Sequence, residues 1–151
     1  MSGLSEHSMR RFGFGAIAFI LGVAGLFAIQ ISATEVWAFL GTTWGPSNLP
    51  LHSSQQFASL TTLFIAVFGG SLIGAIVGRQ DRWWVLAAMC LVGVSVDGYV
   101  MFLKIGDLLP LWFRVTFVTT IVVATAAAGW IFDRLQSRRE AERSGPHAGR
   151  V

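Results

Sequence analysis

Two ionisable side chains lie inside long apolar stretches of this sequence, and they are the residues best suited to chemistry. Asp97 interrupts the apolar stretch 83–103, and Arg114 interrupts the stretch 111–132. An ionisable group inside a membrane-spanning segment is costly, and by default it marks a functional site. A carboxyl group held away from water could act as a general acid or base, with the arginine as its electrostatic partner.

Three further polar residues could join Asp97 and Arg114 in a binding site. Lys104 follows Asp97 by seven residues, which places both on one face of a helix. Gln30 lies near the end of the first apolar stretch, and Tyr99 is close to Asp97 in sequence. Such a cluster could bind or protonate a small molecule. The alternative is a structural ion pair, with Lys104 and Arg114 extending toward the water.

Four apolar stretches must position these side chains, and each is long enough to cross a bilayer as a helix. Spanning a bilayer of about 30 Å takes about 20 residues, and the stretches are 12–31, 57–78, 83–103 and 111–132. The 151-residue chain is 54% hydrophobic and 13% charged, about half the charged fraction of a typical soluble domain. The sequence therefore predicts an all-α protein, an integral membrane four-helix bundle.

The basic residues predict how this bundle is oriented. Nine of the eleven Lys and Arg residues fall on one side: Arg10, Arg11, Arg79, Arg82, Arg134, Arg138, Arg139, Arg143 and Arg150. Cytoplasmic loops carry such an excess, so both termini are expected in the cytoplasm, with the chain in a bacterial inner membrane. Tails 1–11 and 133–151 would then be cytoplasmic, the second basic and disordered beyond the helix end.

The same topology explains the tryptophans and the positive charge. Three tryptophans would lie at the outer interface and three at the inner one: Trp37, Trp44 and Trp112, then Trp83, Trp84 and Trp130. Because the basic residues are accounted for, membrane lipid is the expected partner and nucleic acid is not. One alternative is that residues 1–33 are a cleaved signal peptide, although its apolar run exceeds the usual length.

The connection 32–56 is the only long one on the outer side. Ser32 to Glu35 matches a capping box, followed by an apolar run that Gly41 stops, so a short helix is expected in the outer interface. Residues 42–50 could form a lid over a ligand site, or an ordinary connector. The helix starts are expected at a second capping box (Ser53 to Gln56), at Asp81 and at Pro110.

Small residues indicate how the helices meet. Gly70, Gly74 and Gly78 lie on one face of the second span, and close approach over small residues drives helix association in lipid. The first interpretation is packing within one bundle. The second is a homodimer, or docking onto a larger membrane complex, through this face.

Catalytic and cofactor motifs are missing from the sequence. His7, His52 and His147 lie outside the four spans, and Cys90 has no nearby histidine, so we expect no metal and no cofactor. The favoured hypothesis is a non-catalytic accessory subunit or a binder of a lipid or hydrophobic small molecule. The alternatives are a membrane enzyme with Asp97 as its acid or base, and a small oligomeric transporter.

Several glycine-bearing features resemble one protein family. They are Gly15, Gly22 and Gly25 in the first span, Leu40-Gly41 in the outer loop, the glycines of the second span, and Val96-Asp97-Gly98. Residues 12–132 thereby resemble the DoxX-like group of small four-span bacterial membrane proteins. The resemblance implies the four-helix fold and adds little about activity.

Overall fold

The part of the chain that the structure describes folds into four long helices. The computed structural model describes residues 3–42 and 49–143. Its elements are α1 (Gly3–Phe39), α2 (Ser53–Val77), α3 (Arg82–Tyr99), the π-helical turn η1 (Val100–Lys104), the 3-10 turn η2 (Gly106–Leu108) and α4 (Leu111–Arg143). Four helical segments are long and apolar enough to cross a membrane. The prediction of an all-α bundle of four apolar helices is confirmed.

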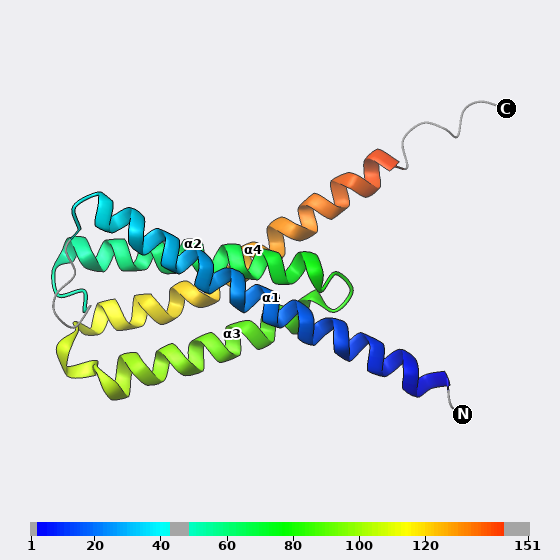
Figure 1. Cartoon of the computed structure of the whole chain (residues 1–151), viewed down its shortest axis with the longest axis horizontal. Coiled ribbons are helices and arrows are strands. Elements are labelled where there is room, and N and C mark those ends of the chain that lie inside the picture. The colour runs from blue at the N-terminus through cyan, green and yellow to red at the C-terminus, as the bar shows by residue number, and fades with distance from the viewer. Residues whose placement is uncertain (1–2, 43–48, 144–151) are drawn as a thin grey trace.

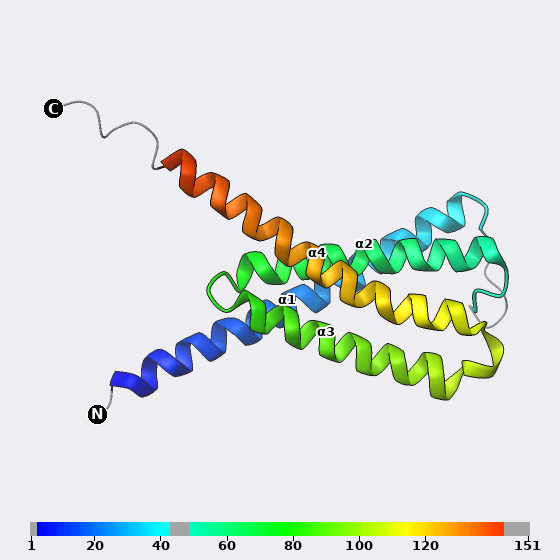
Figure 2. The same ribbon diagram turned by 180° about the vertical axis from the view of Figure 1, so that it is seen from behind.

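Successive helices run in opposite directions along the bundle (Figures 1 and 2). The α1–α2 and α3–α4 connections lie at one end, which we call the outer end. The turn 78–81 lies at the opposite end, called the inner end, beyond which the first turns of α1 and the last turns of α4 diverge. These names follow the predicted orientation, which remains a prediction.

The first helix is longer than expected and includes the segment predicted as a separate interfacial helix. α1 continues without a break to Phe39, so that prediction is wrong. The reason lies in two hydroxyl groups: Ser32 Oγ donates to the Ala28 carbonyl and Thr34 Oγ1 to that of Gln30, each at 2.9 Å. The two hydroxyl groups thus bond to carbonyls of the preceding turn, and they do not cap the start of a new helix.

Gly41 ends α1, as the sequence predicts. Its φ of +84° lies in the left-handed region, which residues with a Cβ rarely adopt. At the other terminus, α1 begins at Gly3, and α4 extends to Arg143. Both helices therefore run well past the expected spans, and the first part of the C-terminal tail is helical. Residues 144–151 of that tail and Trp44 lie outside the described residues.

The starts of the other helices fall at or within one residue of the expected positions. The cap of α2 is His52 rather than Ser53, and its backbone N donates to Gln55 Oε1 at 3.1 Å, so the capping box is shifted by one residue. Asp81 caps α3. Pro110 directly precedes α4, where its carbonyl accepts from the Phe113 backbone N at 3.1 Å.

α2 occupies the middle of the bundle and contacts the other three long helices. Against α1 the two backbones approach so closely that a Cβ on Gly70 would lie 2.6 Å from the Gly22 carbonyl oxygen. Gly74 and Gly78 face Ala18 of α1 and Val85 of α3. The glycine face is thus covered by helices of the same chain, in line with the first interpretation. A homodimer or a larger complex stays a prediction.

Buried side chains join α2 to α4 on the opposite side. Phe113, Ile121 and Ala124 of α4 are buried, the last two in a cluster with Leu63 and Val67 of α2. Within this interface Ser71 Oγ donates to Thr125 Oγ1 at 3.5 Å. Both hydroxyl groups are buried, and a polar pair across two helices helps to hold them together in lipid.

An ion pair between α3 and α4 ties the inner end together. Arg82 Nη2 lies 2.7 Å from Asp133 Oδ1. The Arg82 guanidinium also lies 5.6 Å from the centre of the Phe132 ring. This pair fixes the start of α3 against α4, where α4 leaves the bundle (Figure 2).

Candidate functional site

Asp97 and Arg114 do not form a salt bridge in the structure. Asp97 is half-buried on α3, and no ion pair or hydrogen bond of its side chain is found among the described residues. Tyr99 and Lys104 are exposed on the surface of the bundle. The five residues of the predicted cluster are therefore not joined by direct interactions, although all of them lie in the outer half of the bundle.

Arg114 instead holds the α3–α4 connection in place. Its guanidinium lies 5.5 Å from the centre of the Phe102 ring in η1. A Cβ on Gly106 of η2 would come within 2.7 Å of its Nη1 atom, so the end of the Arg114 side chain packs directly against this glycine. The Nε atom is buried without a hydrogen-bond partner. Arg114 thus packs between the two short turns as a positioning residue.

The α3–α4 connection begins with a local change in helix geometry. The backbone N of Ile105 donates to the Val100 carbonyl at 3.0 Å, five residues back, which defines the π turn η1. Turns of this kind occur frequently at functional sites. Here the connection contributes two side chains, Met101 and Ile105, to a cavity at the outer end.

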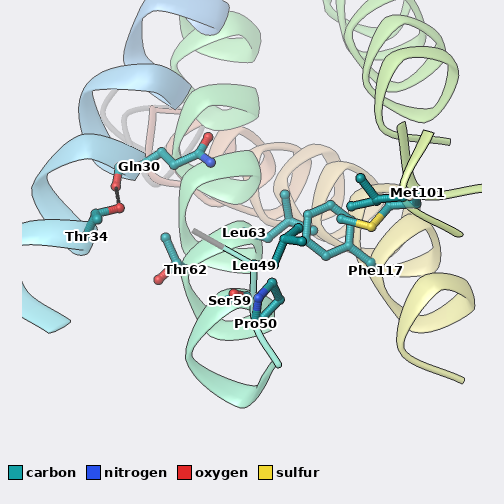
Figure 3. A pocket seen from close by; sticks show the side chains of 10 residues that line it. Gln30, Thr34, Leu49, Pro50, Ser59, Thr62, Leu63, Met101 and Phe117 are labelled. Carbon is teal, nitrogen blue, oxygen red and sulfur yellow. Dashed lines mark hydrogen bonds between the residues drawn. The ribbon is translucent and has the colours of Figure 1, made fainter. Parts of the chain in front are cut away.

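This outer cavity has a volume of about 400 Å³ and lies between α1, α2, α4 and the connections (Figure 3). Six apolar residues and four polar ones line it: Leu49, Pro50, Leu63, Met101, Ile105 and Phe117, with Gln30, Thr34, Ser59 and Thr62. Of the residues predicted for a site, Gln30 lies in its wall. The volume falls within the range of about 300–1,000 Å³ that is typical of small-molecule sites.

The polar groups gather on the side formed by α1 and α2. Gln30 and Thr34 come from α1, and Ser59 and Thr62 from one face of α2 (Figure 3). The Trp37 indole Nε1 donates to Thr62 Oγ1 at 2.8 Å. Thr62 Oγ1 is therefore held in position as an acceptor, with its own proton free to turn toward the cavity.

The opposite side of the cavity is apolar. Met101, Ile105 and Phe117 cover it, and Leu63 forms part of the α2 wall. Leu49 and Pro50 add the end of the outer connection. Most of the expected lid, residues 43–48, lies outside the described residues. The described end of that segment borders the cavity.

The cavity offers binding groups rather than acid–base groups. None of the described residues that line it is ionisable, and the polar ones carry hydroxyl or amide groups that donate and accept hydrogen bonds. Among the described residues, no three His, Cys, Asp or Glu side chains gather closely enough to hold a metal ion. The arrangement suits a ligand with an apolar body and a neutral polar group.

Ser59 and Thr62 line the cavity but were not predicted as site residues, because the prediction was based mainly on charged side chains. Their spacing of three residues puts both hydroxyl groups on one face of α2, and this pattern within an apolar span was the signal available. Met101, Ile105 and Phe117 carried no such signal, because apolar residues cover every face of these helices.

Comparison with known protein families, curated proteins and solved structures found no match. The resemblance to DoxX-like proteins therefore stays a prediction. The four helices, long and apolar enough to cross a membrane, are those of the general class of multi-pass membrane proteins.

Proposed function

We propose that this chain is a non-catalytic protein of a bacterial inner membrane that binds a neutral lipid or other hydrophobic small molecule. Its termini face the cytoplasm, as the distribution of arginines favours. The ligand occupies the outer cavity and enters from the outer leaflet. The observation that carries this proposal is the cavity itself, with its apolar wall opposite four hydroxyl and amide side chains.

A neutral ligand follows from the lining of the cavity. A charged group in an apolar cavity needs a partner of opposite charge, because losing its hydration is costly. Gln30, Ser59 and Thr62 can each form a hydrogen bond but supply no charge. The polar part of the ligand is therefore a hydroxyl, carbonyl or similar group, and the rest of the molecule contacts Met101 and Phe117.

The test is to fill the cavity and analyse what the protein retains. Ser59→Phe places a ring in the space between α1 and α2. The full-length protein is purified in a mild detergent, and its bound neutral molecules are extracted and identified by mass spectrometry. We expect a molecule that accompanies the wild type and is lost from Ser59→Phe.

Ser95→Phe is the matched control, because the same change is made at an exposed position of α3 outside the cavity. It should retain the molecule as the wild type does. Identical extracts from the wild type and Ser59→Phe would refute a ligand site in the outer cavity.

A further inference from the structure

A second hollow lies at the inner end, far from the outer cavity, where α4 diverges from α2 (Figure 2). It is a groove of about 550 Å³ between the last turns of α2 and the emerging part of α4. Its floor consists of the apolar residues Leu72, Ile76, Phe132 and Leu135 together with one polar residue, Gln136. Ile76 and Leu135 are about half exposed, at 56% and 49%, so this surface faces the surroundings of the bundle.

Two arginines close the groove at the same end. Arg79 follows the apolar residues of α2, and Arg139 follows those of α4. α2 and α4 both run toward the inner end. On each helix, therefore, the apolar residues of the groove come first and the arginine follows nearer that end. On α4 the step from Phe132 to Arg139 is seven residues, or about 10 Å along the helix.

Two arginines near the groove already have partners within the protein. Arg82 pairs with Asp133, and Arg134 lies 4.5 Å from the centre of the Trp130 ring. For Arg79 and Arg139, no side-chain ion pair is found within the part of the chain that the structure describes. Both are exposed, so an external anion can reach them.

We propose that the inner groove binds one anionic phospholipid. An acyl chain lies on the apolar floor, and the phosphate accepts hydrogen bonds from Arg79 and Arg139. Arginine binds phosphate oxygens through paired N–H donors, and basic residues at the cytoplasmic surface attract anionic lipid. The apolar residues beside the two arginines offer a surface to an acyl chain, and a lipid joins a charged head to such a chain. A free phosphate would contact the arginines alone.

Glu140 also lines the groove, beside Arg139. Removing its charge should change lipid binding in the direction opposite to the arginine variants. Its carboxylate opposes an anion, so the two arginines and this glutamate leave a formal charge of +1. Glu140→Gln raises that charge to +2 and should increase the retention of anionic lipid.

The main experiment compares lipids bound to the full-length protein. Native mass spectrometry is performed in mild detergent that contains equal amounts of dioleoyl phosphatidylglycerol and dioleoyl phosphatidylcholine. The wild type should retain phosphatidylglycerol preferentially. Arg79→Gln and Arg139→Gln should each lower that retention about fivefold, the effect of one basic residue near a membrane surface.

Arg138→Gln is the matched control for charge. Arg138 is exposed on α4 next to Arg139 but does not line the groove. This variant should bind phosphatidylglycerol as the wild type does. An equal loss in Arg138→Gln would show diffuse attraction by the basic surface and would overturn the site, as would equal retention of the two lipids by the wild type.

A second pair of variants tests the acyl chain. Ile76→Trp fills the apolar floor and should reduce bound phosphatidylglycerol while every charge is kept. Ile65→Trp makes the same change at an exposed position of α2 outside the groove and should have no effect. Unchanged binding in Ile76→Trp would contradict a lipid chain on this floor. Thermal unfolding of each variant checks that the bundle is intact.

Discussion

The backbone of Gly70 on α2 packs directly on the backbone of Gly22 on α1. A Cβ added to Gly70 would lie 2.6 Å from the Gly22 carbonyl oxygen and 2.7 Å from Leu26 Cβ. Both contacts are with parts of α1 that cannot rotate away, so any side chain at position 70 must push the two helices apart.

Gly70→Ala is therefore expected to destabilise the bundle by about 1–3 kcal/mol, the usual cost of overpacking. The measurement is the free energy of unfolding in mixed micelles with increasing denaturing detergent. Gly15→Ala is the control, because a Cβ there has no neighbour within 4 Å. Equal stability of the two variants would show that the Gly70 contact is unimportant.

The hydrogen bond from Trp37 to Thr62 should couple the end of α1 to α2. A double-mutant cycle with Trp37→Phe and Thr62→Val isolates this interaction from the packing of either side chain. We expect a coupling energy of about 0.6 kcal/mol, the average for such bonds between membrane helices. Strictly additive effects on the unfolding free energy would mean that the bond contributes nothing.

The ion pair of Arg82 and Asp133 is expected to contribute modestly, because both side chains are partly exposed. Their exposed fractions are 24% and 36%, so water and salt screen the attraction. Asp133→Asn should lower the unfolding free energy by less than about 1 kcal/mol. Repeating the measurement at high salt should shrink the difference, and a larger difference at high salt would contradict an electrostatic origin.

Arg114→Met tests whether this arginine positions the connection or binds a ligand. The change removes a buried Nε without a partner, which offsets the lost contact with the Phe102 ring, so stability should change by less than about 1 kcal/mol. The molecule extracted from the outer cavity should be the same as in the wild type. If Arg114→Met folds normally but no longer retains this molecule, Arg114 belongs to the binding site.

Asp97→Asn separates the proposed binder from the enzyme and proton-coupled transporter alternatives. Asp97 does not line the outer cavity, so the retained molecule should be unchanged. The decisive measurement is function in the host cell after gene replacement. A loss of function with normal folding and normal ligand retention would favour acid–base work by this carboxyl group.

The sequence by itself determined the four helices and most of their limits. Helix length and apolar composition are local properties, and Gly41 and Pro110 mark helix ends through their own backbone chemistry. The same local reasoning placed a cap at Ser32, but the Ser32 and Thr34 hydroxyl groups bond to the preceding turn and α1 continues to Phe39. Only the tertiary structure shows that its last turns are tied to α2 through Trp37 and Thr62.

Only the tertiary structure decided which faces meet and where the cavities lie. A helix that faces lipid on one side and protein on the other is apolar all round, so no periodic pattern marks its inner face. The approach of Gly70 to Gly22, the turn of Arg114 toward Phe102 rather than Asp97, and the enclosure of Phe117 within the outer cavity depend on residues far apart in the chain. Their positions follow from how four uniformly apolar helices fit together, which the order of residues along any one helix does not encode.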